Sequence, residues 1–267
     1  MLQMKKMAPV ILAVTTICFN IVNAQSSNAI STSVKKDSKN VTAQKGRFIS
    51  IKASSGTEYS VFAAGPENAN SAILFVHDYF GISETTKQSV ERLGALGYRA
   101  IAVDLYKGKS ATTNDSAAAL MNAKNPDETK QILQCAIDYL KRPGRKLASI
   151  GFSAGGIDAM NANLMAPDLF SATAIVYGGS YDKIEKEKLD KLRSPVLAIT
   201  GALDEWPREA ALNFLQNHKD KLFELYIYPG ADHGYAQPLF NGGKNYSAEA
   251  TRVTWMLVED FLARNLK

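Results

Sequence analysis

Short apolar runs that alternate with longer helix-like stretches constrain the fold of this 267-residue chain more than any other feature. The runs are continuous and rich in Val, Ile, Leu and Ala, which is typical of strands buried on both faces of a parallel sheet. They lie at Ala72–Val76, Ala100–Val103, Leu147–Ile150, Ala172–Val176, Val196–Thr200 and Leu225–Tyr228. Helix-like stretches lie between or after them, at Glu84–Leu96, Glu128–Lys141, Ala154–Met165, Arg208–Asn217 and Ala248–Asn265.

A strand pair is expected before this alternation begins. Phe48, Ile49 and Ile51 predict one strand, and Tyr59–Phe62 predicts its hairpin partner. The whole pattern therefore predicts an α/β fold: a doubly wound, mostly parallel sheet with an N-terminal antiparallel hairpin and helices on both faces. The polar stretch 107–126 is interpreted as a loop and helix that cover a site.

The N-terminus has the pattern of a secretory signal peptide. Lys5 and Lys6 form a positive start, Met7–Val22 is mostly apolar, and Ala24 supplies a small residue at the cleavage position. The apolar stretch is short for a membrane-spanning helix. We therefore expect residues 1–24 to be removed and the mature chain to be periplasmic or secreted, without a membrane span. An uncleaved anchor is the alternative.

The rest of the chain divides into a linker and one domain. Residues 25–45 are rich in Ser, Asn, Thr and Lys and predict a flexible linker, whereas residues 46–267 predict a single domain. A chain that is 46% hydrophobic and 21% charged is too apolar for a disordered protein. The formal net charge is +5, but no run of Lys or Arg exceeds two residues, so a nucleic-acid partner is not expected.

A G-x-S-x-G motif follows one of the predicted strands directly. The segment Gly151–Gly156 joins the strand Leu147–Ile150 to the helix that follows it, which is the strand–turn–helix setting of a nucleophile elbow. Glycines on either side of Ser153 let strand and helix approach, so the hydroxyl is pushed out at the carboxyl edge of the sheet. The motif predicts a serine nucleophile. A plain Gly-rich turn is the alternative.

A serine nucleophile needs a base, and the chain has three histidines. His233 lies on a short loop after the last apolar strand and is the best general base. His218 lies at a charged helix end, where a solvated role is simplest. His77 ends the strand Ala72–Val76 and is expected near the site.

The acid that orients the base should lie between serine and histidine in chain order. Asp204 follows the strand Val196–Thr200 and fits this order. Its neighbour Glu205 is one alternative. Asp232 is another, but it adjoins His233 in sequence and is badly placed to reach the far side of that imidazole. Asp204 is therefore the predicted third member of the triad.

Two backbone N–H groups should hold the oxyanion. Ala154, the residue after the nucleophile, supplies one, and Tyr79, in the loop after an earlier strand, is the candidate for the other. Asp78 beside this hole either caps the loop or makes a polar contact with Ser153 or the substrate. The predicted walls of an apolar pocket, for which simple packing is the alternative, are Phe80, Phe152, Trp206 and Tyr235.

Several segments together resemble the dienelactone hydrolase family, from about Thr57 to the C-terminus. The matching segments are His77–Gly81, Gly97-Tyr98, Ala102–Tyr106, Gly151–Gly156, Tyr177-Gly178, Gly201 with Asp204, and Tyr228 with His233-Gly234. The resemblance implies an α/β-hydrolase fold and a hydrolase of carboxylic esters or lactones, with no metal or organic cofactor.

Two positions depart from that family's pattern. The founding members carry Cys as nucleophile, whereas this chain carries Ser153, which makes ordinary esters the expected substrates. Those members also carry an Arg after Asp-Leu-Tyr that binds the substrate carboxylate, and here Lys107-Gly108-Lys109 occupies that stretch. Lys107 or Lys109 could take its place only as a point charge without the guanidinium fork.

The expected function is a serine hydrolase that acts on a small-molecule ester or lactone through an acyl-enzyme. A peptidase or an acyltransferase could use the same three residues. A non-catalytic binding protein on the same fold is the alternative from a different class.

Overall fold

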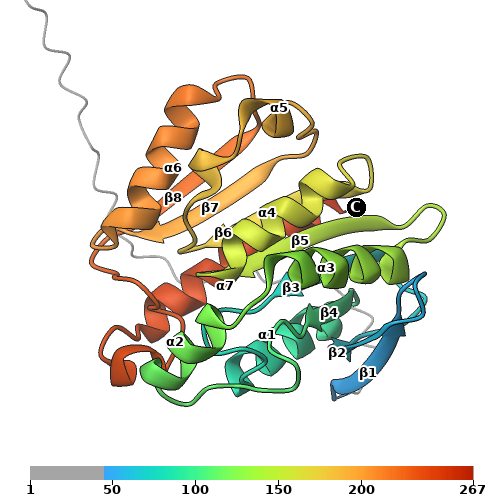
Figure 1. Ribbon diagram of the computed structural model, residues 1–267. Coiled ribbons are helices and arrows are strands. Elements are labelled where there is room, and N and C mark those ends of the chain that lie inside the picture. Colours follow the sequence, from blue (N-terminus) through green and yellow to red (C-terminus); the bar gives the residue numbers. More distant parts are fainter. Residues whose placement is uncertain (1–44, 267) are drawn as a thin grey trace, which may run out of the picture. The chain divides into compact units, whose positions relative to one another are not determined.

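The computed structural model describes residues 45–266 of the chain, and in it eight strands form one sheet in the order β1-β2-β4-β3-β5-β6-β7-β8 (Figure 1). The strands are β1 (Arg47–Lys52), β2 (Glu58–Ala64), β3 (Ser71–Val76), β4 (Arg99–Val103), β5 (Lys146–Phe152), β6 (Phe170–Val176), β7 (Val196–Gly201) and β8 (Phe223–Tyr228). β2 pairs antiparallel with both β1 and β4, and the strands from β4 to β8 are parallel. The predicted mostly parallel sheet with an antiparallel N-terminal hairpin is confirmed.

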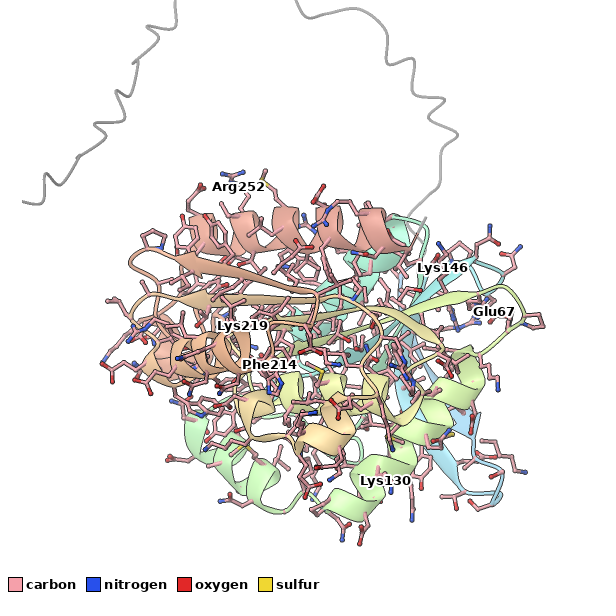
Figure 2. All side chains as sticks on the ribbon, turned by 90° about the horizontal axis from the view of Figure 1, so that it is seen from above. Glu67, Lys130, Lys146, Phe214, Lys219 and Arg252 are labelled. Atoms are coloured by element: carbon pink, nitrogen blue, oxygen red, sulfur yellow. The ribbon has the colours of Figure 1, made fainter. Side chains whose placement is uncertain are left out.

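Helices cover both faces of the sheet. They are α1 (Glu84–Ala95), α2 (Asn114–Asn122), α3 (Pro126–Leu140), α4 (Gly155–Met165), α5 (Lys186–Leu189), α6 (Glu205–Asn217) and α7 (Ala248–Asn265), with short 3₁₀ turns η1 (Tyr181–Lys183) and η2 (Phe240–Gly243). α1 and α7 pack on one face, and α3, α4 and α6 pack on the other. In Figure 2, Arg252 on α7 and Lys130 on α3 mark the two opposite faces.

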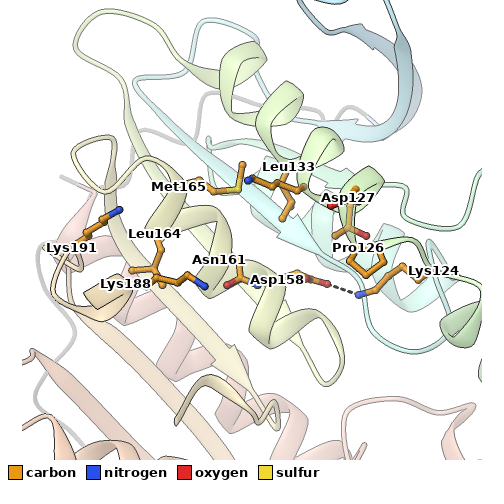
Figure 3. Close-up of a pocket in the computed structure, with 12 residues that line it drawn as sticks. Lys124, Pro126, Asp127, Leu133, Asp158, Asn161, Leu164, Met165, Lys188 and Lys191 are labelled. Atoms are coloured by element: carbon orange, nitrogen blue, oxygen red, sulfur yellow. Dashed lines mark hydrogen bonds and ion pairs between the residues drawn. The ribbon is translucent and has the colours of Figure 1, made fainter. Parts of the chain in front are cut away.

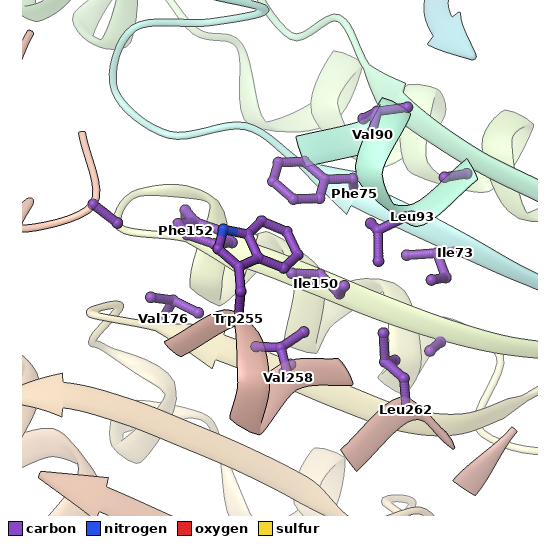
Figure 4. Close-up of a cluster of buried hydrophobic side chains, with 14 of the residues drawn as sticks. Ile73, Phe75, Val90, Leu93, Ile150, Phe152, Val176, Trp255, Val258 and Leu262 are labelled. Atoms are coloured by element: carbon purple, nitrogen blue, oxygen red, sulfur yellow. The ribbon is translucent and has the colours of Figure 1, made fainter. Parts of the chain in front are cut away.

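A cluster of buried aromatic rings lies between the sheet and the pair α1 and α7 (Figure 4). Phe75 of β3 stacks on Phe152 of β5 with ring centroids 5.4 Å apart, and Phe152 lies 5.8 Å from the ring of Trp255 on α7. Burial of rings of this size contributes strongly to stability. Since Phe152 is the last residue of β5, this packing anchors the chain immediately before Ser153.

The polar stretch 107–126 forms the loop and helix that its sequence predicts. Thr113 caps α2, its side-chain oxygen accepting from Ser116 N at 3.3 Å, and Asn125 caps α3 by accepting from Glu128 N at 2.9 Å. Only Ala117 of α2 is fully buried. The helix therefore lies over the carboxyl edge of the sheet as a thinly packed cover.

The predicted signal peptide, residues 1–24, and nearly all of the predicted linker lie outside the described residues. The boundaries of the single domain over residues 46–267 stay a prediction. Between residues 45 and 266, no helix has the length and apolar character needed to cross a bilayer.

Candidate active site

Ser153 sits at the sharp turn between β5 and α4, in a backbone conformation that is rare for a residue with a side chain. Its φ is +48°, in the left-handed region that costs free energy for residues other than glycine. A Cβ on Gly151 would collide with the carbonyl of Gly155, and a Cβ on Gly155 would collide with the carbonyl oxygen of Val76. The two glycines therefore allow strand and helix to close in beneath the hydroxyl, as the motif predicts.

The three residues of the predicted triad form one hydrogen-bonded line. Ser153 Oγ lies 2.8 Å from His233 Nε2, and His233 Nδ1 lies 2.7 Å from Asp204 Oδ2. A carboxylate can only accept, so the proton of the neutral imidazole belongs on Nδ1, which leaves Nε2 with a lone pair facing the serine hydroxyl. The side chain of Asp204 is buried and that of His233 is partly exposed, so the base can reach a bound substrate.

Close contact between two loops holds Asp204 against His233. Leu203 N donates to the carbonyl of Ala231 at 2.9 Å, and a Cβ on Gly201 would collide with that same carbonyl. Asn245 Nδ2 donates to the carbonyl of His233 at 2.8 Å and holds the histidine loop from its other side. Contacts between the loops that follow β7 and β8 therefore position Asp204 and His233, in addition to the hydrogen bond between the two side chains.

Asp232, the alternative acid, is placed as expected. Its Oδ1 accepts from the backbone N–H of His233 at 2.7 Å. That contact caps the loop and leaves the Nδ1 position to Asp204.

The two predicted oxyanion donors lie at the same pocket as Ser153. Within residues 45–266, neither the N–H of Tyr79 nor that of Ala154 has a hydrogen-bond acceptor. Ala154 also begins α4, where the helix dipole favours negative charge. Both N–H groups can therefore donate to a developing oxyanion, and this role stays a prediction.

Asp78 is buried and connects the loop after β3, which contains Tyr79, to the segment after β8, which contains His233 and Gln237. Its Oδ1 accepts from Phe80 N at 2.8 Å, and its Oδ2 accepts from Gln237 Nε2 at 2.6 Å. Burial raises the pKa of Asp78 to about 6, although the two hydrogen bonds and the nearby His233 favour the charged form. The bond from Phe80 N agrees with the predicted loop-capping role of Asp78. The bond from Gln237 is an additional contact with a distant loop.

This raised pKa predicts a pH-dependent contribution to stability. The folded protein holds the Asp78 proton with a pKa of about 6, against an ordinary value of 3.8, so this group's contribution to stability is lost as pH rises between the two values. We expect a loss of about 2 kcal/mol between pH 4 and pH 7. The variant Asp78→Asn should not show this loss, because an amide cannot ionise. Urea denaturation of both proteins at each pH measures it. The amide also loses one hydrogen bond, but that loss is the same at every pH, so parallel stability curves would contradict the assignment.

Comparison with known proteins places the chain in a family. The model of the dienelactone hydrolase family matches residues 59–266. The chain belongs to the dienelactone hydrolase family. The resemblance read from its motifs is thereby confirmed.

Curated and solved relatives cover most of this dienelactone hydrolase family member. Carboxymethylenebutenolidase 1 of Cupriavidus pinatubonensis is 23% identical over 220 residues, which is 77% of this chain and 91% of that protein. A dienelactone hydrolase-like promiscuous phosphotriesterase from metagenomic libraries has a TM-score of 0.69 at 19% identity, covering 83% of this chain and 98% of its own. An esterase of Pyrococcus furiosus has a TM-score of 0.59 at 15% identity, covering 83% and 93%. At these identities the structural likenesses show the fold alone.

The other two histidines take no part in the triad line. His77 is buried, its Nδ1 lies 2.7 Å from the carbonyl of Asp78, and its Nε2 accepts from Leu105 N at 3.3 Å. Burial lowers the pKa of His77, so the ring is neutral and joins the loops that follow β3 and β4. His218 ends α6, half-buried, with its ring 4.8 Å from that of Phe214.

Of the predicted pocket walls, only Trp206 lines the pocket at Ser153, whose volume is about 380 Å³. The prediction of a pocket wall was wrong for Phe80, Phe152 and Tyr235, because these side chains are buried in the core. Phe152 packs against Phe75 and Trp255 in the aromatic cluster. The Tyr235 hydroxyl lies 2.6 Å from the side-chain oxygen of Thr254. Simple packing, the alternative for these residues, describes all three.

Three residues that line the pocket were missed. They are Asn114, Met121 and Phe240. The first two come from the cover helix α2, and Phe240 comes from η2, beyond the histidine. No sequence motif surrounds these three residues. The interpretation of 107–126 as a cover over a site was the one signal, and it concerned only Asn114 and Met121.

Neither lysine of the Lys107-Gly108-Lys109 stretch lines the pocket. Lys107 pairs instead with Glu128, its Nζ 2.9 Å from the carboxylate oxygen. Among residues 45–266, no group of three His, Cys, Asp or Glu could hold a metal ion.

A larger hollow of about 650 Å³ lies between α3 and α4 and shares no lining residue with the Ser153 pocket (Figure 3). An ion pair lies at one end of it, with Lys124 Nζ 2.7 Å from Asp158 Oδ2. Lys130, Lys188 and Lys191 also line it. None of the three triad residues lines this hollow.

Proposed function

We propose that this dienelactone hydrolase family member cleaves carboxylic esters or lactones through an acyl-enzyme on Ser153. The observation that carries the proposal is the hydrogen-bonded line from Asp204 through His233 to Ser153, which ends at a pocket beside two free N–H groups. Family membership supports a hydrolase that acts on ester bonds. The two hydrogen-bond distances of this line, 2.8 Å and 2.7 Å, are within the range that proton transfer from a serine nucleophile requires.

The mechanism follows from these positions. His233 takes the Ser153 proton as Oγ bonds to the ester carbonyl carbon, and the carbonyl electron pair moves onto oxygen beside the N–H groups of Tyr79 and Ala154. Collapse of this intermediate breaks the bond to the alcohol oxygen, which receives the proton from His233. Water then attacks the acyl-enzyme by the same route and releases the acid, while Asp204 orients the imidazole in both halves.

A fluorophosphonate probe tests the proposal, since it reacts with an activated serine and not with an ordinary hydroxyl. We expect one label per native chain, on the peptide that contains Ser153, no label after denaturation, and turnover of p-nitrophenyl acetate. Native protein that stays unlabelled and inactive would instead favour a binding protein. Amide substrates and added acceptor alcohols separate a hydrolase of esters from a peptidase and an acyltransferase.

We further propose that the chain is exported and that its signal is removed after Ala24. The support lies in the sequence alone: a positive start at Lys5 and Lys6, then an apolar stretch, then a small residue at the cleavage position. Expression of the full chain in a Gram-negative host, with intact-mass measurement of the periplasmic fraction, should give a protein that begins at Gln25. A mass that starts at Met1 in the soluble cell fraction would contradict export.

A further inference from the structure

Besides the buried ring of Tyr177, whose centroid lies 5.5 Å away, two aromatic rings of the pocket flank the imidazole of His233. The ring centroid of Phe240 lies 5.2 Å from it, and that of Trp206 lies 6.4 Å from it. Both rings line the pocket that contains Ser153. Trp206 is 47% exposed although it is one of the largest apolar side chains, so a wide ring face is open to a ligand.

Each ring is seated against a glycine. A Cβ on Gly179 would lie 2.7 Å from the ring of Trp206, and a Cβ on Gly234 would lie 2.7 Å from the ring of Phe240. Any larger residue at either glycine would displace the ring beside it. The chain therefore holds both rings in place at the pocket, which argues for a built subsite and against incidental exposure of one side chain.

Reaction geometry determines which part of an ester meets these rings. His233 Nε2 must reach the leaving alcohol oxygen to give it the proton, so the alcohol part lies beside the imidazole. In the proposed mechanism the N–H groups of Tyr79 and Ala154 receive the carbonyl oxygen, not the alcohol part. Trp206 and Phe240 therefore contact the alcohol part of the ester.

The charges around the pocket determine whether a charged or an uncharged ester is favoured. No Lys, Arg, Asp or Glu is among the residues that line this pocket. Lys107 is paired with Glu128, while Asp78 and Asp204 are buried just behind the site. A carboxylate on the substrate would lose hydration there, find no cation and face two acidic groups, which costs binding free energy.

We propose that the site takes uncharged esters whose alcohol part is apolar and aromatic, and that Trp206 determines this preference. The inference rests on the proposed ester hydrolysis and names its substrate class. Trp206 acts by contact with the alcohol part, and has no role in proton transfer.

Three acetate esters test the proposal: benzyl acetate, ethyl acetate and 4-(acetoxymethyl)benzoate. They share one acyl group, and their leaving alcohols are of similar acidity, so they differ in the ring and in the charge. The measured quantity is kcat/KM, which reports the steps up to release of the alcohol. Trp206→Ala removes the ring, Trp206→Phe keeps a smaller one, and Leu215→Ala on the exposed side of the same helix is the matched control.

We expect the ratio of kcat/KM for benzyl acetate to that for ethyl acetate to fall about tenfold in Trp206→Ala. Trp206→Phe should recover most of this ratio, and Leu215→Ala should leave it unchanged. In the native protein, the charged benzoate ester should be at least about tenfold poorer than benzyl acetate. This last comparison needs no variant, so it holds even if Trp206→Ala folds badly.

Equal losses for benzyl and ethyl acetate in Trp206→Ala would overturn the role of Trp206, because a general structural defect lowers both alike. Equal turnover of the charged and uncharged benzyl esters would overturn the substrate class. Failure of the proposed function itself looks different: the native protein would hydrolyse none of the three esters and would not react with a fluorophosphonate.

Discussion

Ser153→Ala is expected to lower kcat for p-nitrophenyl acetate by about 10⁴-fold or more. The hydroxyl oxygen at 2.8 Å from His233 Nε2 is the atom that forms the acyl-enzyme, and a methyl group cannot replace it. What remains should be slow attack by water, helped only by the N–H groups of Tyr79 and Ala154. KM should change little, since the pocket walls are intact.

The control for this variant is Ser55→Ala, which alters an exposed serine in the turn between β1 and β2. Both variants should unfold at the temperature of the native protein, and only Ser153→Ala should lose fluorophosphonate labelling. Turnover by Ser153→Ala at the native rate would remove Ser153 from the mechanism.

Asp204→Asn is expected to lower kcat by about 10⁴-fold while it leaves the shape of the site unchanged. Asp204 Oδ2 lies 2.7 Å from His233 Nδ1 and keeps the proton on that nitrogen. An amide can instead donate to Nδ1, which moves the proton to Nε2 and leaves the serine without a base. Asp204 thus contributes to catalysis by keeping His233 in the tautomer that carries its proton on Nδ1.

The matched control is Asp232→Asn, which alters the acidic neighbour of His233. Its carboxylate accepts from the backbone N–H of His233, and an amide oxygen can still accept there. We expect kcat to change by less than about tenfold. A larger loss from Asp232→Asn than from Asp204→Asn would reassign the acid. The double variant Ser153→Ala with Asp204→Asn should be no slower than Ser153→Ala alone, because residues that act as a unit are not additive.

Local sequence was sufficient for the centre of the sheet because β3, β4, β5, β6 and β7 are buried nearly throughout. A strand covered on both faces must be apolar throughout, so runs such as Ala72–Val76 stand out without any knowledge of their neighbours. Helix starts were harder. α3 begins at Pro126 and α6 at Glu205, which is two and three residues before the predicted starts. The short α5 and the 3₁₀ turns were not among the predicted helices.

The candidate triad was also accessible to local reasoning, because each residue lies in the loop or turn that follows a strand. Ser153, Asp204 and His233 come at the carboxyl ends of β5, β7 and β8, and parallel strands bring those ends to one edge. The order of the strands was not needed for this. Chain order and loop position were enough to choose Asp204 over Asp232.

The walls of the pocket could not be chosen in the same way. Phe80, Phe152 and Tyr235 are as apolar and as close in sequence to the site residues as Trp206 is, yet only Trp206 faces the pocket. Which way a ring points depends on the neighbours available to it. Phe152 has Phe75 and Trp255 to pack against, whereas Trp206 has the bare backbone of Gly179 on one side and open space on the other.

The amino-acid sequence by itself thus determined the parallel sheet and the order of serine, acid and histidine along its edge, because burial and strand ends leave local patterns. Only the tertiary structure decided which rings line the pocket, that Lys107 turns to Glu128, and that Asp78 meets Gln237. Those contacts join residues that are far apart in the chain. Which partner each side chain packs against depends on all of the neighbours that the fold brings together, and a local sequence pattern does not contain that information.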